Sequence, residues 1–338
     1  MLAKWHWHIE ISSRCTLKCA RCARQEVPET LVNTELKLNF FKKNFPKNFV
    51  EQNIKKITFC GDDGDPIYST DLIKTIEYFK NIKPDISIVI ITNGSYKKQS
   101  WWENLALKLN SYDTVHFSID GWNQDSNDLY RTNNNFQSII TGIQTLRKNS
   151  NAYLVWASIA FKFNENKIDT MIQKARDLQM DQFQLTKSTK FGSVYEHYGK
   201  KDELEPSGRY VSSTARFERE VLKLTNRQES THRETCKQNF NNIIQSDYKD
   251  IIPLCAVGNK GIFINSKGEL FPCCWTANRY EHNSDWAAIA KKFNLHDNLL
   301  EDVLNDKFWS SDFQSFKWQE CKTKCNKKIV NLEYAQEW

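Results

Sequence analysis

The sequence has no long apolar run. Its first ten residues, MLAKWHWHIE, are interrupted by His and Glu and offer no apolar core for a signal peptide. No segment approaches the roughly 18 to 20 apolar residues that cross a bilayer. Basic residues form no continuous tract either; they are spread along the chain, whose net charge is +6. We therefore expect a soluble, cytoplasmic protein with no membrane partner, for which a nucleic-acid partner is unlikely.

Internal repeats and low-complexity tracts are also absent, so nothing suggests a repeat architecture. A chain of 338 residues can bury a full core, and its length suits one large domain with a smaller appendage.

Short strand-like segments recur in the first 190 residues. In the first of them, at 5–11, apolar residues alternate with His6, His8 and Glu10. Helical stripes with apolar spacings of three and four lie between the strands, as at 72–79 and 136–146. This alternation predicts a parallel sheet with helices outside, either open or curled into a partial barrel, whose functional loops follow the strands. Further strands are expected at 57–60, 86–91, 115–119, 154–161 and 183–185.

The rest of the chain divides into two parts. From about 187 to 253 the sequence is polar and irregular, apart from an expected helix at 209–224. A C-terminal unit follows, in which GIFINSKGELFPCC predicts a hairpin with its turn at Ser266, Lys267 and Gly268.

Ten cysteines in a chain without an export signal indicate metal binding or redox chemistry more than disulfides. Cys15, Cys19 and Cys22 form a Cys-x3-Cys-x2-Cys segment between the first strand and the first helix. Three thiolates this close can hold three corners of a cubane cluster and leave one iron open. A zinc site would need a fourth ligand from elsewhere, and three reduced thiols without metal are the remaining alternative.

The segment CTLKCARC after a strand resembles the cluster loop of the radical S-adenosylmethionine (SAM) superfamily, and the resemblance covers about residues 5 to 190. It implies an α/β fold, a partial (β/α)6 barrel of the radical SAM type. It also implies that Cys15, Cys19 and Cys22 hold a [4Fe–4S] cluster whose fourth iron binds S-adenosylmethionine. An electron from a donor such as flavodoxin or ferredoxin would split SAM to a 5′-deoxyadenosyl radical that removes a substrate hydrogen. Arg21 stands where the family usually has an aromatic residue, which bears on how the adenine is packed.

Other strand ends match positions that the family places at the cosubstrate. FCGDDGDP resembles the Gly-Gly-Glu-Pro segment that contacts the methionine amino group, and ITNGS and FSIDG match segments near the ribose and methionine. Arg131, in the following helical unit, would lie near the cosubstrate carboxylate. Each residue could instead be an ordinary turn residue or, for Arg131, a surface ion-pair partner. The candidate SAM-binding residues are Gly64, Asp65, Pro66, Thr92, Asn93, Ser118, Asp120 and Arg131.

A second cysteine group begins with Cys255, which is followed by twelve residues, Gly268, four residues and Cys273; Cys321-x3-Cys325 comes later. This pattern resembles the twitch or SPASM extension of radical SAM enzymes. It implies a small C-terminal cluster-binding α+β extension with an auxiliary [4Fe–4S] cluster closed by four thiolates. The few cysteines after the hairpin favour the one-cluster twitch type.

Three points about these cysteines stay open. The same four thiolates could form a structural zinc site. Cys273 and Cys274 could exchange roles, because adjacent residues in a strand point to opposite faces. Cys60 is expected to be a buried small side chain, and Cys236 to be free or a substitute ligand.

The expected domains are a radical SAM partial barrel at 1–190, a linker and substrate-facing segment at 191–253, and a twitch/SPASM-like auxiliary cluster domain at 254–338. Relatives with such extensions modify peptide or protein side chains, and one class dehydrogenates an aminocyclitol alcohol. The resemblance therefore implies first an oxidative peptide- or protein-modifying enzyme. A small-molecule alcohol dehydrogenase comes second, and a nucleic-acid-modifying enzyme third.

A non-catalytic iron–sulfur or zinc-binding protein is the alternative from another class. Such a scaffold would not need the cosubstrate-matching strand ends. The chain starts at its first strand, so we expect no leader-binding domain before it; a separate protein could supply one.

Overall fold

The computed structural model describes residues 3–26, 28, 31–196, 200–212, 218–230, 232–244, 254–258, 261–277, 284–310, 321 and 325. The chain divides into two units. The first unit comprises Met1–Arg14, Val32–Val89 and Ser230–Trp338, and the second comprises Cys15–Leu31 and Ile90–Glu229. In the part of the chain that is described, no helix is long and apolar enough to span a membrane.

The first unit is built on the strand order β2-β1-β8-β9. Strand β1 pairs in parallel with both neighbours, so that Trp7 lies opposite Ile57 of β2 and Ile262 of β8. All four residues of β1 are buried, including His6 and His8, because other segments of this unit cover both faces of the sheet here. The strands are β1 (His6–Ile9), β2 (Lys56–Phe59), β8 (Ile262–Ile264) and the antiparallel β9 (Leu270–Phe271).

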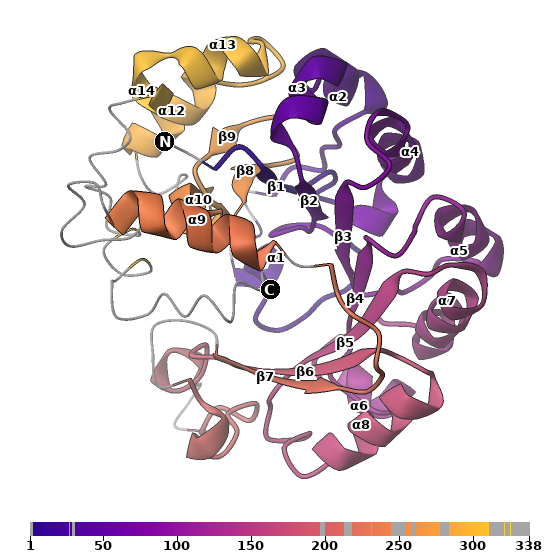
Figure 1. The fold of residues 1–338 in the computed structure, drawn as a ribbon. Helices are drawn as coiled ribbons and strands as arrows, with labels where there is room; N and C mark the ends of the chain where they lie inside the picture. The colour runs from indigo at the N-terminus through magenta and orange to yellow at the C-terminus, as the bar shows by residue number, and fades with distance from the viewer. Residues whose placement is uncertain are drawn as a thin grey trace. The chain divides into compact units, whose positions relative to one another are not determined.

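Helices α2, α3 and α4 lie together beside β1 and β2 (Figure 1). Helix α4 buries Leu72, Ile76 and Phe79, whose spacings of four and three place them on one helical face. Phe79 and Trp7 both pack against the ring of Phe45, at centroid distances of 5.7 and 5.1 Å. The remaining elements of this unit are α2 (Leu38–Asn44), α3 (Lys47–Asn53), a 3-10 turn (Pro66–Tyr68), α4 (Leu72–Ile82), α9 (Arg233–Ile244), α10 (Leu254–Val257), α11 (Cys274–Ala277), α12 (Ser284–Lys292), α13 (Leu300–Asn305) and α14 (Lys307–Ser310).

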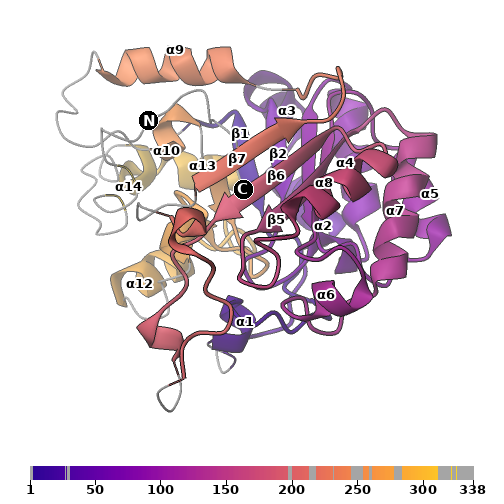
Figure 2. The same ribbon diagram turned by 90° about the horizontal axis from the view of Figure 1, so that it is seen from below.

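The second unit has the strand order β7-β6-β5-β4. Strands β4 (Thr114–Ser118), β5 (Tyr153–Ile159) and β6 (Gln182–Lys187) are parallel, and β7 (Glu218–Lys223) is antiparallel to β6. Strand β3 (Ser87–Thr92) runs from the first unit into the second. Helices α5, α7 and α8 lie along one side of β4 to β6 (Figures 1 and 2).

The packing of α5 against α7 depends on a glycine. A Cβ at Gly142 would lie 2.6 Å from the ring of Trp102, so only glycine lets this indole lie against α7. Helix α7 begins after Asn135, whose side chain accepts a hydrogen bond from the N–H of Ser138 at 2.9 Å. The helices of this unit are α1 (Ala23–Glu26), α5 (Gln99–Ala106), α6 (Gln124–Asp128), α7 (Phe136–Asn149), α8 (Ile168–Asp177) and two 3-10 turns (Ser193–Tyr195, Gly208–Tyr210).

The predicted α/β fold is confirmed: the strands expected before residue 190 are present, and the sheet is open, as a partial barrel requires. The expected C-terminal hairpin is β8–β9, and Gly268 takes a φ of +79° in its turn. The prediction of a helix at 209–224 is wrong. That stretch contains the edge strand β7, whose half-exposed and exposed residues pair with β6.

Candidate active site

Cys15, Cys19 and Cys22 lie close together in the second unit. Cys19 is buried, while Cys15 and Cys22 are half-buried. The N–H of Cys22 donates to the carbonyl of Cys19 at 3.1 Å, which turns the chain just before α1. All three thiols contact one apolar cluster of side chains. The three cysteines of the predicted triad therefore lie against the same cluster of side chains.

This cluster, which we call the aromatic wall, is built from Leu17, Cys19, Tyr130 and Phe161. The rings of Tyr130 and Phe161 lie 4.3 Å apart, and Phe163 stacks on Phe161 at 5.4 Å. Such apolar surroundings limit water around the buried thiol of Cys19 and strengthen the electrostatic interactions there.

Arg131 lies beside the buried thiol of the triad. Its Nη1 is 4.0 Å from the Sγ of Cys19. Burial raises the pKa of Cys19 to about 11, and the positive charge of Arg131 opposes that rise. A cation at this distance favours the thiolate, which is the form that binds iron. The donor set therefore fits a cluster held by three thiolates.

Arg131 is itself held by Asp120. The Nε of Arg131 donates to Oδ2 of Asp120 at 2.6 Å, and Oδ1 of Asp120 accepts from the N–H of Ile159 at 2.7 Å. Asp120 is fully buried. Although burial lowers it, the Asp120 carboxylate raises the pKa of Arg131 above its usual value, so the guanidinium stays charged. Two residues predicted to contact SAM thus form a buried ion pair, and their contacts with SAM stay predictions.

The turn after β4 depends on Asn127, which the sequence reasoning missed. Its Oδ1 accepts from the N–H groups of Asp120 and Gly121 at 2.9 and 3.1 Å. A Cβ at Gly121 would lie 2.2 Å from the backbone nitrogen of Asn127. The glycine of FSIDG is therefore needed for this turn.

Thr92 and Asn93 end β3 and serve the turn that follows. The Oγ1 of Thr92 accepts from the N–H of Gly94 at 3.0 Å, and Gly94 has a φ of +71°. The Nδ2 of Asn93 donates to the Sγ of Cys15 at 3.6 Å. Asn93 thus contacts the triad, and Ser118 is the half-buried last residue of β4. The contacts of Thr92, Asn93 and Ser118 with SAM stay predictions.

Arg21 occupies the position before the third cysteine. Its Nη2 lies 2.5 Å from Oδ1 of Asp202, a carboxylate with 1% side-chain exposure. The guanidinium carbon also lies 3.8 Å from the centre of the Tyr195 ring. Arg21 is therefore tied to the segment after β6, a role that its sequence position alone did not indicate.

Gly64, Asp65 and Pro66 lie in the first unit, in the loop after β2. A Cβ at Gly64 would lie 1.9 Å from the carbonyl oxygen of Ser12, so no larger residue fits. Oδ1 of Asp65 accepts from the N–H of Ile67 at 3.1 Å and caps the 3-10 turn that begins at Pro66. The glycine and the aspartate thus have structural roles here, and their contacts with SAM stay predictions.

Glu10, which directly follows β1, is the other residue that the sequence reasoning missed. Its carboxylate is buried and accepts from the backbone of Asp63 and Gly64. Burial, and then the charge of Asp63, raise the pKa of Glu10 to about 7. The sequence pattern that could have singled out Glu10 is the alternation of His6, His8 and Glu10, which places a charged residue at the end of β1.

The four predicted auxiliary ligands are all buried, in the first unit. Burial raises the pKa of Cys255, and the charges of Cys273, Cys325 and Cys321 raise it further. The N–H of Cys325 donates to the carbonyl of Cys321 at 2.9 Å. Three of these cysteines thus lie near enough to Cys255 to affect the charge of its thiol, which fits a four-thiolate cluster site.

The other cysteines are placed as follows. Cys274 begins α11 and is 1% exposed, and Cys236 is buried on α9. Cys60, which the sequence predicted to be buried, is half-buried, and this burial raises the pKa of its thiol. Within the described ranges, no three His, Cys, Asp or Glu side chains are placed to hold a single metal ion.

Comparison with known proteins agrees with these two cysteine groups. The model of the radical SAM superfamily matches residues 9–174, and that of the SPASM iron–sulfur cluster-binding domain matches residues 255–326. The chain belongs to the radical SAM superfamily. A radical SAM protein with a SPASM domain binds S-adenosylmethionine at a [4Fe–4S] cluster and also holds auxiliary iron–sulfur clusters.

Sequence relatives include AlbA of Bacillus subtilis, described as an antilisterial bacteriocin subtilosin biosynthesis protein. It is 24% identical over 95% of this radical SAM chain and 64% of its own length. The GTP 3′,8-cyclase of Campylobacter lari is 26% identical over 40% of each protein. This chain thus spans less than two thirds of these relatives.

Solved structures share the fold. SuiB of Streptococcus suis, bound to S-adenosylmethionine, has a TM-score of 0.55 at 14% identity over 95% of this chain and 70% of its own. The enzyme anSMEcpe with bound AdoMet has a TM-score of 0.52 at 13% identity over 94% of this chain and 84% of its own.

Proposed function

We propose that this radical SAM enzyme oxidatively modifies a side chain of a peptide or protein. The observation that carries the proposal is the match to AlbA, a bacteriocin biosynthesis protein, along 95% of this chain. SuiB, which has been solved with its precursor peptide SuiA, shares the fold with a TM-score of 0.53. These relatives support a peptide substrate.

Three cysteines of the second unit would hold the SAM-binding cluster: Cys15, Cys19 and Cys22. When bound, the cluster and SAM supply one-electron cleavage chemistry that ends in removal of a substrate hydrogen atom. Asn93 and Arg131 contact two of the three thiols. The aromatic wall keeps water from this side of the triad.

Cys255, Cys273, Cys321 and Cys325 would hold one auxiliary cluster. Four thiolates leave no iron open for substrate, so this cluster suits electron transfer rather than substrate binding. Loss of a hydrogen atom leaves the substrate with one unpaired electron. Transfer of that electron to the auxiliary cluster, with loss of one proton from the substrate to solvent, would complete a two-electron oxidation.

The first experiment measures SAM cleavage. The enzyme is reconstituted anaerobically with iron and sulfide, reduced with dithionite and given SAM. We expect wild type to form 5′-deoxyadenosine and Cys19→Ala to form none. If wild type with a fully loaded N-terminal cluster forms none, the proposed activity is wrong.

The second experiment identifies the substrate class. A pool of deuterated peptides and, separately, a pool of deuterated aminocyclitol alcohols are incubated with the enzyme and SAM. A peptide substrate should transfer deuterium into 5′-deoxyadenosine only from the peptide pool. Transfer only from the alcohols would replace the peptide proposal with a small-molecule dehydrogenase.

A further inference from the structure

One buried carboxylate of the first unit contacts two loops that are about two hundred residues apart in sequence. Oε1 of Glu10 accepts from the N–H groups of Asp63 and Gly64 at 2.7 and 3.1 Å. Oε2 accepts from the N–H of Ser266 at 3.4 Å. Glu10 is 2% exposed. A buried carboxylate is costly unless it is hydrogen-bonded, and backbone N–H groups take that role here.

The sheet explains why Glu10 reaches both loops. Strand β1 lies between β2 and β8 and runs parallel to both, so all three strands end at the same edge. The N–H of Glu10 donates to the carbonyl of Ile264 at 2.8 Å, and the N–H of Cys60 donates to the carbonyl of Ile9 at 3.2 Å. Main-chain bonds on both sides therefore fix the residue between the two loops.

The first loop, residues 60–65, is what we call the Gly64 loop. It lies directly against the chain that leaves β1, because a Cβ at Gly64 would lie 1.9 Å from the carbonyl oxygen of Ser12. The N–H of Asp65 donates to the carbonyl of Arg14 at 2.9 Å. The shape of this loop thus depends on its contacts with residues 10–14.

The second loop is the turn of the C-terminal hairpin, residues 265–268. The N–H of Gly268 donates to the carbonyl of Asn265 at 3.0 Å, and the hydroxyls of Ser266 and Thr34 lie 2.8 Å apart. The hairpin continues through β9 to Cys273, a predicted ligand of the auxiliary cluster. The turn is therefore part of the same short segment as that ligand.

We propose that Glu10 is a positioning residue for the enzyme: its carboxylate holds the Gly64 loop in the shape that binds SAM and joins that loop to the turn of the auxiliary-cluster hairpin. This role rests on the proposed function, which requires SAM to bind, and on the resemblance of FCGDDGDP to the segment that contacts the methionine amino group. Glu10 itself touches neither SAM nor the reacting atoms.

The test compares Glu10→Ala, Glu10→Gln and a control, Glu35→Ala. Glu35 is a suitable control because its side chain is 3% exposed and accepts from the N–H of Thr70 at 2.7 Å in the same unit. The assay is EPR titration of the reduced N-terminal cluster with SAM in the reconstituted enzyme, together with iron content. The SAM-induced spectral change gives the dissociation constant.

We expect Glu10→Ala to raise the SAM dissociation constant by about tenfold to a hundredfold, because two N–H groups of the loop lose their acceptor. Glu10→Gln keeps an oxygen for Asp63 and Gly64, so its dissociation constant should stay within about threefold of wild type. Glu35→Ala should leave the dissociation constant unchanged. Iron content should be normal in all three variants.

A Glu10→Ala protein that binds iron normally and SAM as tightly as wild type overturns the proposal. Hydrogen–deuterium exchange on wild-type enzyme tests the link between the loops even if that variant does not fold. We expect SAM to slow exchange in residues 60–65 and 265–268 together. Protection of 60–65 alone removes the link to the hairpin. Wild type that shows no SAM-induced spectral change overturns the proposed function itself.

Discussion

The ion pair between Arg131 and Asp120 offers the sharpest test of the cluster site. In Arg131→Met, Asp120 keeps its hydrogen bond from the N–H of Ile159 but loses its cation. Breaking a buried ion pair from one side costs about 3–5 kcal/mol of unfolding free energy. Since Asp120 is fully buried and Arg131 is 16% exposed, we expect a loss in that range.

The same substitution should change the reduction potential of the N-terminal cluster. One charge interacts with another at about 4 Å by about 4 kcal/mol at an effective dielectric constant of about 20. Asp120 carries its charge in wild type and in the variant, so it does not reduce this change, and the expected shift is up to about 4 kcal/mol, or roughly 170 mV. Reduction adds negative charge to the cluster, so removal of the Arg131 cation should lower the potential.

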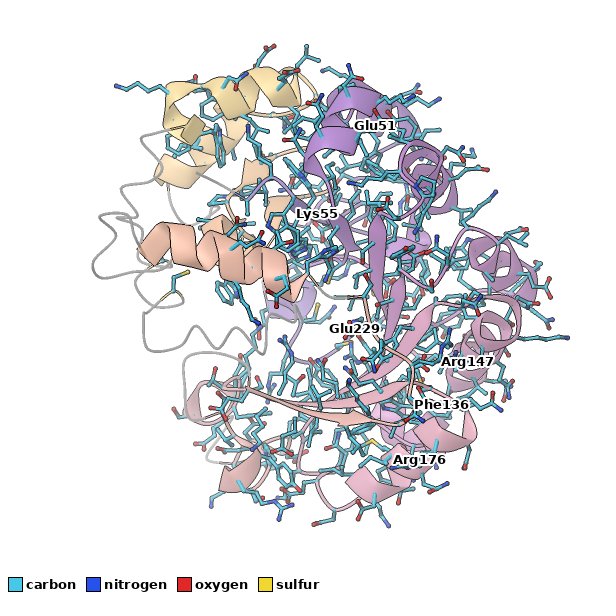
Figure 3. The ribbon with its side chains drawn as sticks, in the orientation of Figure 1. Glu51, Lys55, Phe136, Arg147, Arg176 and Glu229 are labelled. Carbon is cyan, nitrogen blue, oxygen red and sulfur yellow. The ribbon has the colours of Figure 1, made fainter. Side chains whose placement is uncertain are left out.

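Arg147→Met is the matched control. Arg147, labelled in Figure 3, lies on α7, and its Nη2 is 2.5 Å from Oδ2 of the fully buried Asp181. Both arginines belong to the second unit and are nearly equally buried, at 15% and 16% side-chain exposure. This control should lose stability too, although somewhat less, because Arg227 lies 3.8 Å from the same carboxylate. It should not change the cluster potential.

The potential is measured by EPR at fixed potentials, with the N-terminal cluster identified by its response to SAM. Stability is measured by denaturant unfolding under anaerobic conditions. A potential in Arg131→Met within about 20 mV of wild type, at normal iron content, would refute the electrostatic argument. An equal shift of the potential in Arg147→Met would show that general destabilisation of the fold, not loss of the local charge, causes the shift.

Three further predictions concern other parts of the chain. Cys273→Ala should lose the auxiliary cluster and Cys274→Ala should keep it, as measured by iron content and EPR; the reverse result would exchange the two assignments. The raised pKa of Glu10 means that the folded protein binds a proton more tightly than the unfolded chain does, so this group's stabilisation falls as pH rises through about 7. Wild type should therefore lose about 1 kcal/mol relative to Glu10→Gln between about pH 6 and about pH 8 in denaturant unfolding, and equal slopes would contradict this. Arg21→Phe removes the cation beside buried Asp202 and should speed hydrogen exchange in residues 200–204, whereas unchanged exchange would mean that this ion pair does not hold the segment.

Local patterns were enough to find most strands. The apolar segments before residue 190 predicted β1 to β6. A short run of apolar residues indicates a buried strand from the local sequence alone. The alternation around β1 suggested one buried and one exposed face, yet His6 and His8 are buried as well. Both faces are buried because other segments cover them: Trp7 packs against Phe45 on one face, and Nδ1 of His6 lies 3.1 Å from the carbonyl oxygen of Gly258 on the other. These contacts depend on residues far away in sequence.

The helix expected at 209–224 shows the opposite limit. The stretch from Glu218 to Lys223 mixes charged and apolar residues and is half-exposed, so its own periodicity does not favour a strand strongly. Its conformation is decided by hydrogen bonding to β6, with Gln182 opposite Lys223. A neighbouring strand can override weak local preference.

The sequence by itself determined the two cysteine groups, the strands before residue 190, and the family to which the chain belongs, because spacing and periodicity are local properties. The tertiary structure decided what the polar residues at the strand ends do. Asp120 pairs with Arg131, and Arg21 pairs with Asp202. Glu10 accepts from two distant loops because parallel strands bring their carboxyl ends to one edge. These contacts join residues far apart in the chain, and only the folded backbone sets which buried charge meets which partner.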